Sequence, residues 1–298
     1  MLGYNKKMYI LPFDHRSSFV KIFIGRKTGR DLKKEKFLFE YKNIIFKSFL
    51  IAIRRINQPD DCLVFLDDEY SKDVIRVARR KRVGFALAVE KSGSKYFDFE
   101  HGDSFGEVVQ KYNPNFVKAL VRFNPDDKKA KENQMARLSL LSKWCRDNKF
   151  KFILELLIPP SQKDQSKYKK DRYKYDLSVR PALTLRAISQ LRQLGIEPDV
   201  WKIEAMETKS DWEPVIEKIR LGPVRAKVAI IMLGRGASFA KVKHWIDNSP
   251  KGELNGFAVG RTVWMRPLLD LHQGKISKKQ AMNQIADNYL ELIRLWEG

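Results

Sequence analysis

Short apolar runs alternate along this chain with longer stretches in which apolar residues recur every three or four positions. The short runs are rich in Val, Ile, Leu and Phe, as buried strands of a parallel sheet are, whereas the longer stretches have the period of amphipathic helices. Eight runs have the strand character, at residues 8–13, 62–66, 84–89, 116–121, 152–157, 200–205, 228–233 and 256–260. The alternation predicts βα units that build a parallel sheet.

The helical stretches strengthen this prediction. They include residues 35–56, 135–148, 181–195 and 212–222, and the last two end on glycines that are typical of helix C-termini. Eight βα units in 298 residues match a (β/α)8 TIM barrel better than an open doubly wound sheet. No Gly-rich dinucleotide fingerprint or Walker loop favours the open sheet. We therefore expect one α/β barrel domain over residues 1–298.

Composition excludes several classes of protein. With 43% hydrophobic residues the chain can build a large core, yet no apolar run reaches the roughly 18 residues of a membrane span. The N-terminus lacks the long apolar stretch of a signal peptide, so we expect a soluble, cytoplasmic protein without membrane partners. Cys62 and Cys145 have neither the number nor the spacing of a disulfide framework or a zinc site.

The formal net charge of +22 raises the possibility of a nucleic-acid partner, because a basic surface attracts polyphosphate. Lysine and arginine are, however, spread over most polar segments, with local concentrations at residues 25–36, 78–82 and 161–176. The last segment interleaves tyrosine with lysine, as base-stacking surfaces do, but a solvated loop or helix face has the same composition. A non-enzymatic nucleic-acid-binding protein is thus the alternative from another functional class, and it is not the one we expect.

Charged residues stand at nearly every predicted strand end. In a TIM barrel the C-terminal ends of the strands carry the site. In strand order these residues are Asp14, His15 and Arg16; Asp67, Asp68 and Glu69; Glu90 and Lys91; Lys118 and Arg122; Glu155; Lys202 and Glu204; Gly234, Arg235 and Gly236; and Gly260 and Arg261. One charged strand end would mean little, but this many together predict a functional site.

Lys202 is the most unusual of these residues, because it interrupts an apolar run suited to a buried strand. Burial of an unpaired cation is unfavourable, so Lys202 needs either an ion pair with Glu204 or a chemical task. Lys118 lies on another even-numbered strand and is expected in the same interior layer, where a second cation would favour the neutral, nucleophilic form of an amine. Glu155, on the strand between them, would be the general acid/base. A Lys/Glu network that merely fills the barrel is the structural alternative.

The last two strand ends predict an anion site. Gly234, Gly236 and Gly260 allow backbone N–H groups to approach an anion, and Arg235 and Arg261 can bind phosphate. Metal ligands are not apparent in the same way, since the four histidines lie far apart. The acidic turn at residues 67–69 could hold magnesium, although such turns more often cap the following helix.

Several blocks of the sequence resemble a known family. LPFDHRSSF, FVKALVRFNP, FILELLIPP, PDVWKIEA, MLGRGAS and GFAVGRTVW resemble, in order and spacing, the class I aldolase-like domain fused to the sugar kinase of bacterial myo-inositol catabolism proteins. That domain is related to aldolases for tagatose 1,6-bisphosphate and sulfofructose phosphate. The resemblance implies a Schiff-base lysine at Lys202, an acid/base at Glu155 and a supporting Lys118, with Asp14 and Glu90 as further acids. The GRG at residues 234–236 departs from the tagatose enzymes and favours a substrate with a second anion such as a carboxylate.

Together these observations predict a class I aldolase that needs no metal or cofactor. The expected reaction cleaves 6-phospho-5-dehydro-2-deoxygluconate into dihydroxyacetone phosphate and malonate semialdehyde, and tagatose 1,6-bisphosphate or sulfofructose phosphate is the alternative substrate. Lys202 would attack the C5 ketone and Glu155 would take the C3 hydroxyl proton. We expect Arg235 and Arg261 at the phosphate, Arg122 or Arg16 at the carboxylate, and Asp14, His15 and Glu90 near the substrate. The sequence leaves open whether the chain forms a homo-oligomer.

Overall fold

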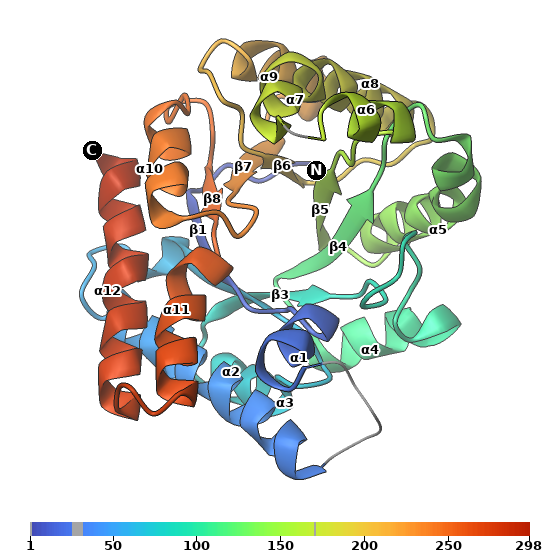
Figure 1. The fold of residues 1–298 in the computed structure, drawn as a ribbon. Coiled ribbons are helices and arrows are strands. Elements are labelled where there is room, and N and C mark those ends of the chain that lie inside the picture. The colour runs from blue at the N-terminus through green and yellow to red at the C-terminus, as the bar shows by residue number, and fades with distance from the viewer. Residues whose placement is uncertain (1, 26–31, 170) are drawn as a thin grey trace.

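Eight parallel strands close into a barrel in the computed structural model, which describes residues 2–25, 32–169 and 171–298 (Figure 1). Each strand pairs with the next one along the chain, and β8 pairs with β1. The strands are β1 (Met8–Pro12), β2 (Cys62–Leu66), β3 (Gly84–Ala88), β4 (Phe116–Arg122), β5 (Lys151–Leu157), β6 (Val200–Glu204), β7 (Ala229–Leu233) and β8 (Gly256–Ala258). The predicted (β/α)8 TIM barrel is thereby confirmed.

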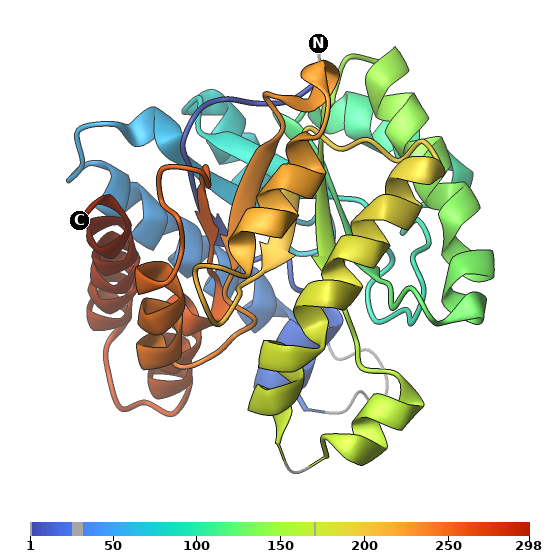
Figure 2. The ribbon, with the colours of Figure 1, turned by 90° about the horizontal axis from the view of Figure 1, so that it is seen from above.

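Helices surround the barrel and cover the outer face of its strands (Figure 1). They are α1 (Ser17–Phe23), α2 (Leu32–Ile53), α3 (Lys72–Arg80), α4 (Phe105–Tyr112), α5 (Lys128–Asp147), α6 (Gln162–Lys167), α7 (Arg172–Ser178), α8 (Arg180–Gln193), α9 (Trp212–Arg220), α10 (Phe239–Asp247), α11 (Arg261–His272) and α12 (Lys278–Glu297). Figure 2 shows α6 and α7 projecting beyond the C-terminal ends of the strands.

Helix α5 begins earlier than its apolar pattern predicted. The Asp127 side chain accepts a hydrogen bond from the Ala130 backbone N–H and so caps the helix at its N-terminus. The first turns are polar in sequence, yet Ala130 and Gln134 are buried in them. Gln134 is satisfied there because it accepts from the Phe97 N–H and donates to the Arg122 carbonyl. A cap and buried polar contacts therefore extend the helix beyond its apolar stripe.

An apolar plug fills the barrel toward the N-terminal ends of the strands. Residues two apart on a strand face the same side, so each strand sends alternate side chains inward. The plug consists of Met8, Ile10, Leu63, Phe65, Ala86, Phe116, Ile153, Val200, Ala229, Ile231 and Ala258. The charged residues of β4, β5 and β6 gather above this layer, at the C-terminal end of the barrel.

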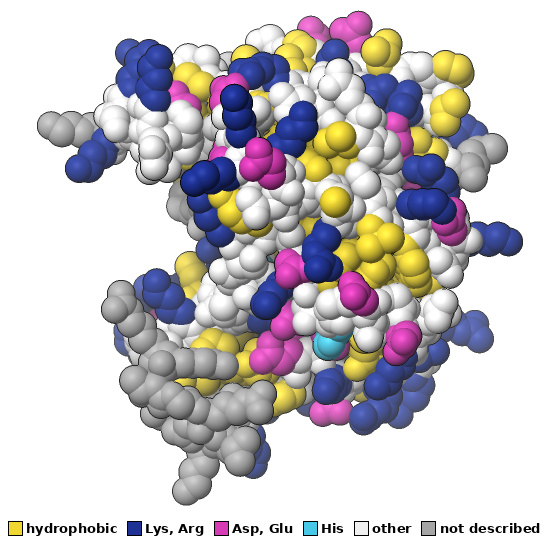
Figure 3. All heavy atoms as spheres, turned by 90° about the vertical axis from the view of Figure 1, so that its right-hand side faces the viewer, with side chains coloured by type: hydrophobic (Ala, Val, Ile, Leu, Met, Phe, Trp, Pro, Cys, Tyr) yellow, Lys and Arg dark blue, Asp and Glu magenta, His cyan; other side chains and the backbone are white. Residues whose placement is uncertain are grey.

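The structure describes the basic segments only in part. Residues 26–31 of the segment 25–36 lie outside the described residues, as does Lys170 of the segment 161–176. On the face shown in Figure 3, Lys and Arg are interspersed with Asp and Glu. Nucleic-acid binding stays a prediction from charge alone. Of the helices in the described ranges, none combines the length and the apolar character that a membrane span requires.

The pairing of β8 with β1, which closes the barrel, can be tested by substitution of Gly256. Gly256 has φ +144°, and a Cβ at this position would lie 2.1 Å from the Met8 carbonyl oxygen. We expect Gly256→Ala to lower the free energy of unfolding by about 3 kcal/mol, since both the backbone and the neighbouring strand must shift. Urea denaturation measures this change. Gly252→Ala is the matched control, because nothing lies within 4 Å of its Cβ position; an equal loss in both variants would contradict the account.

Candidate active site

Lys118 lies at the centre of a buried ionic cluster at the C-terminal end of the barrel. Its Nζ is 2.8 Å from Asp14 Oδ2, 2.5 Å from Glu90 Oε1 and 3.1 Å from Glu155 Oε2. These carboxylates come from the ends of β1, β3 and β5, while Lys118 itself is on β4. The Lys118 side chain is only 2% exposed, so its charge depends on these three partners.

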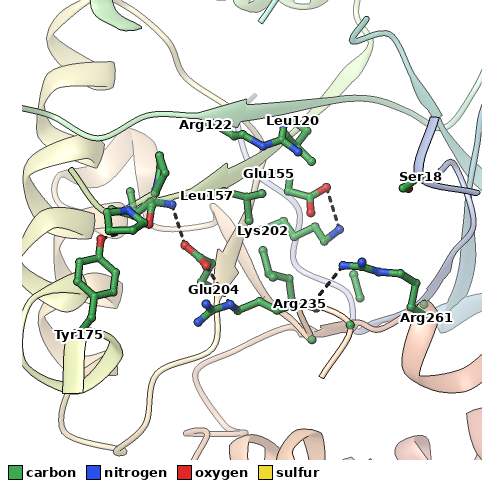
Figure 4. Close-up of a pocket in the computed structure, with 18 of the residues that line it drawn as sticks. Ser18, Leu120, Arg122, Glu155, Leu157, Tyr175, Lys202, Glu204, Arg235 and Arg261 are labelled. Carbon is green, nitrogen blue, oxygen red and sulfur yellow. Dashed lines mark hydrogen bonds and ion pairs between the residues drawn. The ribbon is translucent and has the colours of Figure 1, made fainter. Parts of the chain in front are cut away.

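Lys202 shares a carboxylate oxygen with Lys118. Glu155 and Lys202 are register partners on β5 and β6, and Lys202 Nζ lies 2.9 Å from Glu155 Oε2 (Figure 4). The amine also lies 5.0 Å from the centroid of the Phe65 ring, which belongs to the apolar plug. Glu204 pairs with Arg235 and not with Lys202, so the alternative of an ion pair between Lys202 and Glu204 is wrong. Lys118, Glu155 and Lys202 are thus brought together as predicted from strand order.

The pKa shifts in this cluster indicate which of its groups are charged. Burial raises the pKa of Glu155, but Lys202 and Lys118 outweigh it and lower the pKa to about 2. Burial also opposes ionisation of Asp14, yet Lys118 and His15 hold its pKa below the usual range. Burial lowers the pKa of Lys118, whereas Asp14, Glu90 and Glu155 hold it well above the usual range. At neutral pH Lys118 is therefore an ammonium ion, and Glu155 and Asp14 are carboxylates.

Glu90 differs from the other two carboxyl groups. Its pKa is raised, chiefly by burial, although Lys118 and Arg16 oppose the shift. Its Oε1 contacts Lys118, and its Oε2 is buried without a hydrogen-bond partner. Glu90 therefore pairs with Lys118 from the end of β3.

A cavity of about 760 Å³ opens above the ionic cluster. Lys202, Glu155 and Glu204 line its floor, and Arg122 at the end of β4 lines one side (Figure 4). Its outer wall comes from the segment that carries α6 and α7, which was predicted only as a solvated loop or helix face. Ser161 and Asp164 form a capping box that starts α6, and the Tyr168, Lys169 and Tyr175 side chains border the cavity.

The loops after β7 and β8 form the opposite side of the cavity. Gly234, Gly236 and Gly260 all line it, as expected from the sequence. Gly236 has φ +69°, and a Cβ there would lie 2.6 Å from Arg261 Cζ. The guanidinium of Arg261 therefore packs across Gly236, and its Nη2 donates to the Arg235 carbonyl oxygen at 3.1 Å. No carboxylate pairs with Arg261 among the described residues.

The positive charge of Arg235, in contrast, is balanced by two carboxylates of the protein. Its Nη1 is 2.8 Å from Asp176 Oδ2, and its Nε is 3.2 Å from Glu204 Oε1. Burial lowers the pKa of Arg235, but Glu204 and Asp176 outweigh it and raise the pKa. Glu204 also accepts a hydrogen bond from the Ile158 N–H at 2.7 Å. Arg235 thus joins the loop after β7 to β6 and α7.

Asp176 and Arg180 were missed by the sequence reasoning. Arg180 is fully buried, and its Nε donates to Asp176 Oδ1 at 3.0 Å while its Nη2 donates to the Ala205 carbonyl at 2.7 Å. This pairing orients Asp176 toward Arg235. The one signal in the sequence is an arginine followed by proline at the start of an apolar helix, where the arginine needs a buried partner.

Arg16 and His15 have different surroundings, although they are adjacent in sequence. Arg16 is buried; its Nη1 is 2.7 Å from Glu100 Oε2, and its Nη2 donates to the Glu90 carbonyl. Arg16 does not border the cavity, and neither do Asp14 and Glu90, so the expectation that these three residues contact the substrate is wrong. His15 does border the cavity, and its ring packs edge-on against Trp264.

The acidic turn after β2 holds its neighbours in place. Asp67 pairs with the buried Lys42 and accepts from the backbone N–H groups of Glu69 and Tyr70. Asp68 Oδ2 lies 2.7 Å from His101 Nε2. In the described ranges, His, Cys, Asp and Glu side chains form no group of three or more with the arrangement of a metal site. Asp67 therefore stabilises the turn before α3, and the expected helix cap is not formed, since the N-cap residue of α3 is Ser71 and no side chain caps it.

Comparisons with known proteins agree with this fold. The family model described as "Uncharacterized protein conserved in bacteria (DUF2090)" matches residues 3–298. No curated protein matches the sequence. The fructose-bisphosphate aldolase of Plasmodium falciparum has a similar structure, with a TM-score of 0.65 and 12% identity over 98% of this chain and 90% of that one.

Two bacterial structures are similar as well. Cgl0159 of Corynebacterium glutamicum has a TM-score of 0.57 and 14% identity, covering 97% of this chain and 87% of its own. The fructose-bisphosphate aldolase of Slackia heliotrinireducens has a TM-score of 0.53 and 12% identity, covering 95% and 86%. At such identities the likeness is one of fold, an aldolase-like barrel.

Removing the Lys118 ammonium tests the charge assignment. We expect Lys118→Met to lower the free energy of unfolding by about 3–5 kcal/mol at neutral pH, because three carboxylates lose their shared cation. Burial then raises the pKa of Asp14 and further raises that of Glu90, while Glu155 keeps Lys202, so the variant gains stability as pH falls. The deficit relative to the unmodified protein should narrow toward about pH 5 in urea denaturation. Lys143→Met, which breaks only an exposed pair with Asp147, is the control; a pH-independent deficit would contradict the assignment.

Proposed function

We propose that this chain, which belongs to the DUF2090 family, is a class I aldolase that forms a Schiff base through Lys202. The observation that carries the proposal is the single oxygen of Glu155 that contacts both Lys202 and Lys118 at the floor of the cavity. Such an arrangement offers one amine that can react and a second that remains charged. The fold likeness to two fructose-bisphosphate aldolases supports the same reaction class.

Lys118 and Lys202 have different roles in this proposal because their ion-pair partners differ. Lys118 has three carboxylates and keeps its proton, whereas among the described residues Lys202 pairs only with the shared Glu155 oxygen. A proton can pass from Lys202 to Glu155 over their 2.9 Å contact, which frees the amine to attack a ketone carbon. Glu155 returns this proton to the hydroxyl of the resulting carbinolamine, which leaves as water, so that an iminium ion forms on Lys202 and Glu155 is a carboxylate again.

Glu155 then acts as the general base for carbon–carbon cleavage. It borders the cavity and is a carboxylate at neutral pH, so it can take the proton of the substrate hydroxyl. The hydroxyl carbon becomes an aldehyde as the adjacent carbon–carbon bond breaks. The bonding electrons move into the iminium, which becomes an enamine on Lys202.

The cations of the cavity indicate how the substrate lies. Arg122 ends β4 and Arg261 follows β8, and these strands are opposite each other in the closed barrel. Arg261 has no carboxylate partner among the described residues and packs beside Gly236 and Gly260, so we assign it the phosphate. Arg122 is exposed at the other side and would hold the second anion. Arg235, already paired with two carboxylates, would support the loop rather than supply the main phosphate charge.

A substrate with an anion at each end fits these positions. In 6-phospho-5-dehydro-2-deoxygluconate the phosphate is on C6, the ketone on C5 and the carboxylate on C1. Attack at C5 by Lys202 and removal of the C3 hydroxyl proton by Glu155 would yield dihydroxyacetone phosphate and malonate semialdehyde. Tagatose 1,6-bisphosphate and sulfofructose phosphate also carry two anionic ends and remain the alternatives within this class.

Borohydride trapping tests the Schiff base. With dihydroxyacetone phosphate present, reduction should add one covalent adduct to the protein, and peptide mass spectrometry should place it on Lys202. Lys202→Met should abolish the adduct. Lys169→Met, which removes another lysine bordering the cavity, should keep it. An adduct that persists in Lys202→Met would exclude the proposed mechanism.

A substrate panel with Arg122→Gln tests the second anion site. We expect the KM for 6-phospho-5-dehydro-2-deoxygluconate to rise about tenfold to a hundredfold, the loss of a hydrogen bond to a charged group. Trapping with dihydroxyacetone phosphate should be unchanged, because that product lacks the carboxylate. Arg76→Gln, on the exposed face of α3, is the control. An equally large rise for substrates without a second anion would show that Arg122 serves another purpose.

A further inference from the structure

His15 borders the cavity on the side opposite Glu155. It follows β1, and β1 and β5 face each other across the closed barrel. Its ring packs edge-on against Trp264, with 5.6 Å between the ring centroids. The Trp264 Nε1 is held by the Pro12 carbonyl at 3.0 Å, so the surface against which the imidazole packs is fixed.

The Nδ1 atom of His15 is buried and has no hydrogen-bond partner in the part of the chain that the structure describes. It lies 3.9 Å from Asp14 Oδ1. Asp14 uses its other oxygen, Oδ2, to contact Lys118 at 2.8 Å, which leaves Oδ1 facing the imidazole. A carboxylate beside Nδ1 stabilises an imidazolium ion when Nε2 takes up a proton.

The imidazole is neutral in the absence of ligand. Burial lowers the pKa of His15 to about 4; Asp14 opposes the shift, while Arg261, Lys118 and Lys202 add to it. A phosphate dianion bound to Arg261 would offset one of these cations and make proton uptake by the ring easier. The ring therefore lies where the phosphate-bearing half of a substrate would be held.

The proposed reaction contains a second proton transfer that Glu155 is poorly placed to perform. After cleavage, the enamine carbon must gain a proton before dihydroxyacetone phosphate can be released. Glu155 lies on β5 beside β4, whose Arg122 we assign to the anion of the aldehyde half. Lys118 holds its proton among three carboxylates, and Glu90 does not border the cavity.

We propose that His15 is the second acid–base residue and transfers a proton between its Nε2 and the hydroxymethyl carbon of the Lys202-bound dihydroxyacetone phosphate. This inference rests on the proposed function. In the condensation direction Nε2 takes the proton, the C–H electrons form the carbon–carbon double bond of the enamine, and the iminium π electrons move onto nitrogen. In cleavage the imidazolium returns the proton to the same carbon. His15 takes up this proton from solvent when the phosphate binds, and Glu155 releases the hydroxyl proton to solvent after cleavage, so a full cycle has no net change.

Hydrogen–deuterium exchange separates this step from Schiff-base formation. The full chain is incubated with dihydroxyacetone phosphate in D2O, proton NMR follows loss of the hydroxymethyl hydrogen signal, and borohydride trapping is measured in parallel. The unmodified protein should show both exchange and trapping. His15→Gln and His15→Asn should keep trapping at Lys202 while exchange slows at least about a hundredfold, the range for loss of a general acid–base group. His244→Gln, on the surface of α10, is the matched control and should keep both.

Each other outcome overturns a different statement. If both His15 variants trap and exchange like the unmodified protein, the role of His15 is wrong and the aldolase proposal stands. If both variants lose trapping as well, His15 builds the site instead of moving the proton, and the inference is also overturned. If the unmodified protein neither traps nor exchanges, the proposed function itself fails.

Discussion

One carboxylate oxygen, Oε2 of Glu155, contacts two buried amines from the strands on either side of it. Removing these charges from water is costly, and the cost is offset only because the charges lie within ion-pair distance of one another. The apolar plug directly below keeps water out of the lower barrel and strengthens every pair above it. Strands β4, β5 and β6 are therefore joined at the barrel mouth by charge as well as by backbone hydrogen bonds.

The cluster is asymmetric, and its chemical use depends on that asymmetry. Lys118 is surrounded by Asp14, Glu90 and Glu155, whereas Lys202 has one shared carboxylate and the face of Phe65. In the proposed reaction the two lysines therefore have different roles, Lys118 as a fixed cation and Lys202 as the nucleophile. Arg235 and Arg261, in the loops after β7 and β8, differ in their partners in a similar way. Glu204 and Asp176 occupy Arg235, and Arg261 is left to face the cavity.

The barrel and the central triad of charges could be predicted because both follow from short-range rules. Buried parallel strands are continuous apolar runs, and the two-residue period of a strand places Lys118, Glu155 and Lys202 inside once the strand order is known. The partners of Arg16 and Arg235 could not. Glu100 and Asp176 lie in connecting segments, and in a chain with 58 basic residues and 36 acidic ones the pairing depends on loop conformation. The start of α5 was hidden for a related reason, since its first turns are polar.

The central claim is that Lys202 forms a covalent bond with a phosphorylated ketone while Lys118 remains paired. A crystal structure of the protein soaked with dihydroxyacetone phosphate tests this most directly. The account predicts continuous density from Lys202 Nζ to the carbonyl carbon, the phosphate against Arg261 and the loops after β7 and β8, and an intact Lys118 cluster. A ligand bound without a bond to Lys202, or one joined to another residue, would contradict it.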